Sequence, residues 1–183
     1  MNQQHKYNVS SLSSAPSPLK LFSKLPEITG CEVIFNEMTM SPSPTPLHQL
    51  LLSDLHALIY AFLHENNAGK VLTSPTDVYF EHYDSAIQPD LSILLNDNLH
   101  QIKKDGIYGA PDVVIEILSR NRTYDTQRKK SLYEKAGVKE YFMIDPENKK
   151  TILLTLNESG VYNQTYEEVG VFNSNILSCK ISF

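Results

Sequence analysis

Two carboxylates in otherwise apolar segments are the residues of this sequence best suited to metal chemistry. Asp90 follows Pro89 at the start of a predicted strand, and Glu116 stands in the middle of VVIEILS. A carboxylate on a strand covered on both faces must be paired, hydrogen-bonded or bound to a cation, because unpaired burial is costly or forces protonation. On neighbouring strands the two could share Mg²⁺, which prefers oxygen ligands. Alternatively, Asp90 caps a strand end and Glu116 pairs with an arginine.

Asp112 is a candidate for a third carboxylate of the same site. It lies four residues before Glu116, and the strand period of two places both side chains on one face of the strand. Its position directly after Pro111 favours the other interpretation, a turn residue at the beginning of the strand.

A basic block, SRNRTYDTQRKK, follows directly after the segment that carries Glu116. Positive charge beside a carboxylate site suits a phosphate-bearing substrate, because cations offset the charge of a phosphate backbone. The alternative is a solvated helix face, which is what most charge runs form. The basic residues of the block, set against one acid, are Arg120, Arg122, Arg128, Lys129 and Lys130.

Two helices are expected to position these residues. Thr45 and Pro46 are typical of an N-cap followed by proline at the first helical position, and leucines recur after them at helical spacing. Asn67 or Gly69 can end this helix. A second helix is expected from Asn121 or Thr123 to about residue 136, before a glycine.

Alternating and continuous apolar runs predict the strands around these helices. In chain order the central elements read α-β-β-β-α-β, which predicts an α/β fold with a mixed central sheet flanked by helices. Additional β-hairpins are expected near both ends of the chain. The predicted segments are a hairpin at 31–40, strands at 70–80, 88–95, 111–119 and 140–145, and a hairpin plus a last strand after residue 150.

Length and composition fit one domain of ordinary size. The chain has 183 residues, of which 41% are hydrophobic and 20% charged. We expect a flexible arm at 1–20 and a single domain at 21–183. No apolar run approaches the roughly 20 residues of a membrane span, and the polar start lacks a secretory signal. Cys31 and Cys179 have no CxxC partner, which is typical of free thiols in a reducing, cytoplasmic compartment.

The net charge of −5 conceals an uneven distribution. Residues 100–150 contain 11 basic and 8 acidic residues, a balance of +3, whereas the rest of the chain has 5 basic and 13 acidic residues, a balance of −8. An acidic total therefore does not exclude nucleic acid, but it predicts modest affinity that weakens as salt rises.

Four segments together resemble a known family. FNEMTMSPSPTPLHQ, QPDLSILL, GAPDVVIEILS and DTQRKKSLYEKAGVKEYFMIDP occur in the order seen in the Uma family of endonucleases, within the PD-(D/E)XK nuclease superfamily. They extend over roughly residues 30 to 150. The resemblance implies a restriction-endonuclease-like αβββαβ core, Mg²⁺ or Mn²⁺ as cofactor, nucleic acid as substrate with DNA favoured, and a homodimer.

The same resemblance implies roles for individual residues. Asp90 matches the metal-binding aspartate and Glu116 the acid of the (D/E)XK element, with the backbone carbonyl of Ile117 as a further metal ligand. Leu118 stands where that element has its lysine. Lys129 fits the family pattern Asp-x-x-x-Lys-x-x-x-Tyr, formed here with Asp125 and Tyr133, and could replace the missing lysine by reaching back from the helix.

Other residues match family positions with less specific roles. Glu37 could complete the metal site from the N-terminal hairpin, and His48 with Gln49 lies in the first turn of the long helix, where capping or packing is the common role. The phosphate contacts without sequence readout would come from Arg120, Arg122, Arg128 and Lys130.

The resulting hypothesis is metal-dependent hydrolysis of phosphodiester bonds. Asp90 and Glu116 would hold the metal, and Lys129 would orient or help deprotonate the attacking water and stabilise the transition state. Leu118 at the lysine position favours a second hypothesis, a non-catalytic module that binds nucleic acid or protein on a nuclease fold. A third, a small-molecule phosphoesterase, would need an enclosed pocket. The distance from the Lys129 amine to the two carboxylates distinguishes the first two.

Overall fold

The computed structural model describes residues 17–22, 30–40, 43–119 and 122–183. The largest of its three sheets has six strands in the order β11-β10-β9-β8-β6-β3. Among neighbouring strands of this sheet, only β8 and β9 run parallel. Its strands are β3 (Gly69–Thr73), β6 (Leu91–Leu95), β8 (Val113–Ile117), β9 (Glu140–Ile144), β10 (Lys150–Leu156) and β11 (Tyr162–Val169).

A second sheet of five strands has the order β2-β1-β5-β4-β7, and a two-stranded hairpin closes the chain. The five strands are β1 (Cys31–Ile34), β2 (Glu37–Met40), β4 (Val78–Phe80), β5 (Ser85–Ile87) and β7 (Ile107–Tyr108); the hairpin consists of β12 (Val171–Ser174) and β13 (Cys179–Ser182). The helices are α1 (Pro18–Phe22), α2 (Pro46–Glu65) and α3 (Arg122–Ala136), with 3-10 turns η1 (Glu81–Tyr83) and η2 (Asn96–Gln101).

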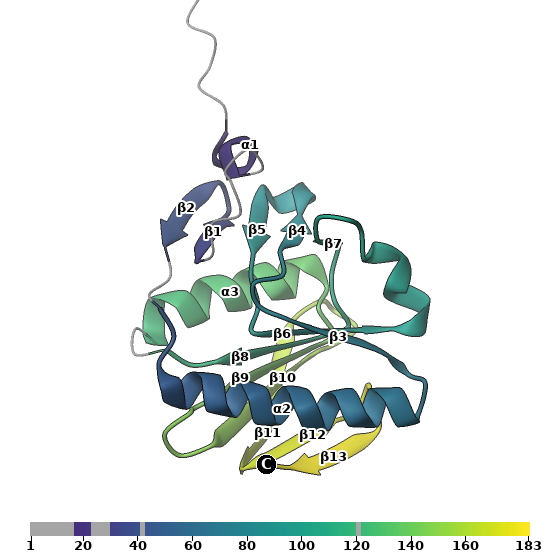
Figure 1. The fold of residues 1–183 in the computed structure, drawn as a ribbon. Coiled ribbons are helices and arrows are strands. Elements are labelled where there is room, and N and C mark those ends of the chain that lie inside the picture. The colour runs from purple at the N-terminus through teal and green to yellow at the C-terminus, as the bar shows by residue number, and fades with distance from the viewer. Residues whose placement is uncertain (1–16, 23–29, 41–42, 120–121) are drawn as a thin grey trace, which may run out of the picture.

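The expected αβββαβ order is present as α2, β3, β6, β8, α3 and β9 (Figure 1). Thr45 caps α2 by accepting a hydrogen bond from the His48 amide, as expected, and Asn67 adopts a positive φ after the helix ends. Gly137, at φ +89°, follows the last residue of α3. A separate finding is that no helix among the described residues has the length and apolar character of a membrane span.

The central strands β6, β8 and β9 of the six-stranded sheet are buried on both faces because α2 and α3 lie on opposite sides of the sheet (Figure 1). On the α2 face, leucines and isoleucines of the helix pack against the odd-numbered residues of β8, Val113, Ile115 and Ile117. On the other face, Val114 packs with α3 and with the five-stranded sheet. Burial on both faces explains why β8 is a nearly continuous apolar run. The alternation of side chains along β8 turns Glu116 toward α3.

Three details differ from the sequence-based expectation. The predicted strand at 70–80 is divided at Ser74-Pro75: β3 stays in the six-stranded sheet and β4 joins the other, because proline cannot donate to a ladder and Thr76 turns back on Thr73. The predicted strand at 88–95 is shorter, since β6 begins at Leu91. Where one last strand was expected, the chain has the hairpin of β12 and β13. Two backbone N–H groups of its turn donate hydrogen bonds to buried Glu140.

Helix α1 overlaps the end of the arm expected at 1–20 and packs on β1, β2 and β5. The remainder of that predicted arm, residues 1–16, lies outside the described residues.

Asp112 has a structural role at the beginning of β8, in agreement with its interpretation as a turn residue. Its buried carboxylate accepts hydrogen bonds from the Leu95 amide at 2.8 Å, from the Asn98 side chain at 2.8 and 2.9 Å and from Lys139 Nζ at 2.7 Å. Burial alone would raise the pKa of Asp112, but the hydrogen bonds from Lys139, Asn98 and Leu95 outweigh it and lower the pKa. The carboxylate thus ties η2 and the approach to β9 to the sheet.

We predict that Asp112→Asn lowers the free energy of unfolding at pH 7 by about 2 kcal/mol, because buried donors lose a charged acceptor. Because folding lowers the pKa of Asp112, the extra stability of the wild type is fully present above pH 3.8, the ordinary pKa of aspartate. It is lost as the pH falls through the lower pKa of the folded state. Urea unfolding of both proteins between pH 7 and pH 3 measures this difference. A difference that stays constant over this range contradicts the assignment.

Candidate active site

Strand pairing brings Asp90 and Glu116 together. Strands β6 and β8 are antiparallel neighbours, with Leu91 opposite Ile115, so the residue before Leu91 lies across from the residue after Ile115. Leu91 and Ile115 both point toward α2, so the alternation of β8 turns Glu116 to the α3 side, and Asp90 stands next to it directly before β6. The expected pair of carboxylates on neighbouring strands is formed at one end of the sheet.

The carboxylate of Asp90 is held by two groups. The Ile117 amide donates to Asp90 Oδ2 at 2.7 Å, and His48 Nε2 lies 3.2 Å from the same oxygen. Burial alone would lower the pKa of His48, but its hydrogen bond to Asp90 and the charges of Asp90 and Glu116 raise it above the usual value. The helix α2 thus contributes His48 from its first turn, next to the Thr45 cap.

Glu116 is buried and its carboxylate is fully engaged by α3. Tyr133 donates its hydroxyl proton to Oε1 at 2.5 Å, and Lys129 Nζ lies 3.2 Å from both oxygens. Burial is the largest influence on Glu116 and raises its pKa; the Lys129 charge acts in the opposite direction, while the charges of Asp90 and Glu32 raise it further. The result is a pKa raised to about 7, for which burial is the main cause and the neighbouring carboxylates are a smaller one.

Lys129 enters the cleft from α3. It lies four residues before Tyr133, so both side chains leave the helix on the same face, and both are buried. Burial alone would lower the pKa of Lys129, but the charges of Glu116, Glu32 and Asp90 outweigh it and raise the pKa above its usual value. The amine is therefore an ammonium ion, placed beside the strand position where Leu118 replaces lysine.

Glu32 is the site residue that sequence reasoning did not identify. It belongs to β1 in the five-stranded sheet, is 2% exposed, and its Oε1 lies 3.0 Å from Lys129 Nζ. The backbone N–H of Gln88 donates a hydrogen bond to the same oxygen at 3.0 Å. The available signal was the one that identified Glu116: a lone acid in an apolar strand, here CEVI.

Several predicted residues lie elsewhere. Glu37 is not in the cleft, because it sits on the exposed strand β2 and its Oε2 lies 2.9 Å from Arg128. Arg128 also donates to the Ile34 carbonyl at 2.8 Å. Asp112 lies at the other end of β8 from Glu116, about 13 Å away at the rise of a strand. Arg120 and the side chains of Arg122 and Asp125 lie outside the described residues.

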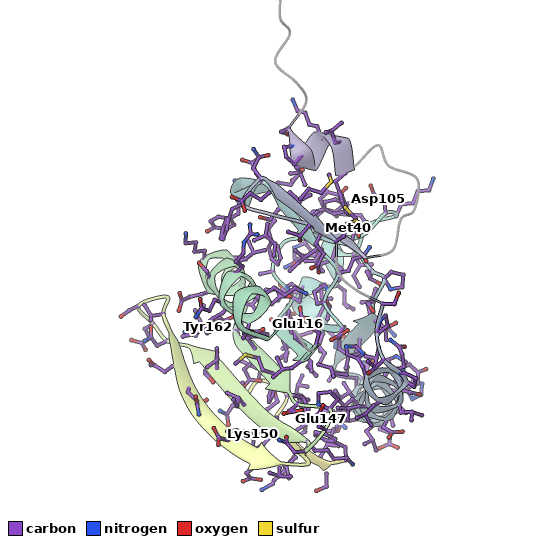
Figure 2. All side chains as sticks on the ribbon, turned by 90° about the vertical axis from the view of Figure 1, so that its left-hand side faces the viewer. Met40, Asp105, Glu116, Glu147, Lys150 and Tyr162 are labelled. Carbon is purple, nitrogen blue, oxygen red and sulfur yellow. The ribbon has the colours of Figure 1, made fainter. Side chains whose placement is uncertain are left out.

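The four charged groups open onto a cleft of about 1230 Å³ between the two sheets and the N-terminal end of α2. In Figure 2, Glu116 lies in the interior between α3 and α2. Acids exceed bases in the lining, since Glu32, Asp90, Glu116 and Glu147 are set against Lys129 and His48. Serine, threonine and glutamine side chains contribute further polar groups: Ser43, Ser74, Ser119, Thr45, Thr126, Gln49 and Gln88.

Within the part of the chain that the structure describes, no group of three or more His, Cys, Asp or Glu side chains is arranged to hold a metal. The ammonium of Lys129 explains this, because it lies between Glu116 and Glu32. The cleft provides oxygen ligands for a cation, namely the carboxylates of Asp90 and Glu116, which lie beside the backbone of Ile117. Hard oxygen ligands of this kind suit Mg²⁺, which retains waters in its coordination shell.

Comparisons with known proteins identify the family and the fold. The model of the Uma2 family, "Putative restriction endonuclease", matches residues 20–180. A crystal structure of "a putative nuclease belonging to DUF820 from Anabaena variabilis ATCC 29413" is similar to this chain, with a TM-score of 0.74 and 20% sequence identity over 91% of this chain and 95% of that chain. The similarity confirms the expected nuclease-like fold. A search of curated proteins finds no match.

We predict that Lys129→Met lowers the free energy of unfolding by about 3–5 kcal/mol at neutral pH, because it leaves buried Glu116 and Glu32 without their counter-ion. Lys130→Met is the matched control, since Lys130 is the half-buried neighbour on the same helix, and it should change stability by less than about 1 kcal/mol. Urea unfolding at one pH measures both variants. Equal stabilities of the two variants would contradict the buried ion pair.

Proposed function

The chain belongs to the Uma2 restriction endonuclease family, and from this premise we propose that it is a metal-dependent endonuclease that hydrolyses phosphodiester bonds of DNA. One observation carries the proposal: Lys129 Nζ lies 3.2 Å from both carboxylate oxygens of Glu116, whose neighbouring strand presents Asp90. This supplies, from a helix, the lysine that the strand lacks at Leu118. The same distance supports a catalytic role over a binding module.

The charge of the cleft supports a requirement for a divalent cation. A phosphodiester carries negative charge, and a lining with more acids than bases would repel it. Burial is the largest cause of the raised pKa of Glu116, and the charges of Asp90 and Glu32 raise it further. Asp90, Glu116 and the carbonyl of Ile117 are the residues proposed to hold Mg²⁺ or Mn²⁺. When bound, such an ion lowers the pKa of a coordinated water and offsets charge on the scissile phosphate.

The protein's own residues would orient the reaction. His48 and the Ile117 amide fix the Asp90 carboxylate, and Tyr133 fixes that of Glu116. Lys129 keeps its proton because its pKa is raised, so it is unsuited to act as the base that deprotonates water. We propose instead that the ammonium donates hydrogen bonds to an oxygen that gains negative charge in the transition state.

The substrate backbone is proposed to pass the beginning of α3. Leu118, Ser119 and Thr126 flank this helix N-terminus and line the cleft, and a helix N-terminus favours phosphate. Arg120, Arg122 and Lys130 remain proposed phosphate contacts. Arg128 is retained in that set with a second role, since it already binds Ile34 and Glu37. The open cleft favours a polymer over a small phosphoester.

A single domain at 21–183, a homodimer and a cytoplasmic location are part of the same proposal.

We predict that the purified protein nicks supercoiled plasmid with Mg²⁺ or Mn²⁺ and that EDTA abolishes the activity. Asp90→Ala combined with Glu116→Ala should reduce the rate at least about 100-fold, because the metal site is lost. Asp54→Asn, on the exposed surface of α2, is the control and should cleave as the wild type does. Metal-dependent cleavage that persists in the double variant would refute the site.

We also predict salt-sensitive DNA binding by the double variant. If Arg120, Arg122 and Lys130 neutralise three phosphates, raising NaCl from about 50 to 200 mM should weaken binding about 40-fold. Fluorescence anisotropy with a labelled duplex measures the affinity, and a labelled RNA of the same sequence tests the preference for DNA. Binding without any cleavage by the wild-type protein would establish the alternative function, a non-catalytic module.

A further inference from the structure

Glu32 reaches the cleft from a different sheet than the other carboxylates. Asp90 and Glu116 belong to the six-stranded sheet, whereas Glu32 is on β1 of the five-stranded sheet. The side chain of Glu32 is 3% exposed, and its Oε1 lies 3.0 Å from Lys129 Nζ. The two sheets therefore meet at the ammonium of Lys129, which contacts Glu116 of one sheet and Glu32 of the other.

The charges of these groups indicate why a second acid is present. The formal charges of Glu32, Asp90, Glu116 and Lys129 sum to −2, which one divalent cation would neutralise, and such a cation would favour the ionised form of Glu116. A cation on Asp90 and Glu116 would take up the oxygens that now lie 3.2 Å from Lys129 and would repel the ammonium. Lysine has a long flexible side chain, so without another partner it would move to solvent.

We propose that Glu32 is a positioning residue: it keeps the Lys129 ammonium in the cleft while Glu116 binds a cation. This inference rests on the proposed nuclease function. Two features prepare Glu32 for the role. The Gln88 amide, 3.0 Å from Oε1, fixes the carboxylate, and the apolar neighbours Cys31 and Val33 on β1 are buried, so the strand cannot shift easily.

The geometry of the pair separates this role from that of a third metal ligand. Oε1 of Glu32 makes two contacts, one to Lys129 Nζ and one to the backbone N–H of Gln88. The Asp90 carboxylate, by contrast, is held by His48 and by the backbone N–H of Ile117. A positioning residue affects turnover with metal affinity nearly unchanged, whereas a ligand affects metal affinity first.

The test is Glu32→Gln, which keeps the shape and an oxygen for the Gln88 amide but removes the charge that holds Lys129. Glu65→Gln, at the exposed end of α2, is the matched control. At saturating Mn²⁺, cleavage by Glu32→Gln should fall about 10- to 100-fold, while the half-saturating Mn²⁺ concentration changes less than about threefold. A tenfold or larger rise in that concentration with full turnover at saturation would make Glu32 a metal ligand and overturn the proposal.

A second readout needs no activity. Acylation of Lys129 by an amine-reactive ester, followed by peptide mass spectrometry in the presence of Mn²⁺, reports whether the amine leaves the cleft. Labelling should be at least about fivefold faster in Glu32→Gln than in wild type or Glu65→Gln. Unchanged labelling refutes the role of Glu32. Faster labelling in a protein that cleaves no nucleic acid supports it and refutes the proposed function alone.

Discussion

The ion pairs of Lys129 are the interaction on which the candidate site depends. One ammonium is shared by Glu116 of the six-stranded sheet and Glu32 of the five-stranded sheet, and α3 delivers it between them. Such buried pairs add little net stability, because removing charges from water offsets their attraction, but losing one partner is expensive. The relative placement of both sheets and α3 is therefore coupled to the electrostatics of the cleft.

The same arrangement gives the cleft its chemical character. Acids outnumber bases around it, so it favours divalent cations and disfavours an isolated phosphate. Burial is the main reason that the pKa of Glu116 is raised to about 7. The excess of acids adds to this effect, and it also raises the pKa of Lys129 above its usual value. A cation would relieve that excess and convert the cleft into a phosphate-binding site, which links metal and substrate binding.

The αβββαβ order and most of the site could be predicted because local patterns encode them. Glu116 and Asp90 stood out as acids in apolar strands, and Lys129 and Tyr133 share a helix face by their spacing of four. The burial of individual residues in the N-terminal hairpin, β1 and β2, was harder to predict. Glu37 matched a family position, yet Glu32 enters the cleft, because Glu32 lies on β1, whose four residues are buried, whereas Glu37 lies on the exposed edge strand β2.

The sequence by itself determined the elements, their order, and the identity of the two strand carboxylates, because helical and strand periods are properties of neighbouring residues. Only the tertiary structure decided that residues 70–80 serve two sheets, that Glu32 meets Lys129, and that Arg128 is bound to Glu37. These contacts join segments up to about a hundred residues apart. They depend on how whole sheets pack around α3, and no local pattern specifies that packing.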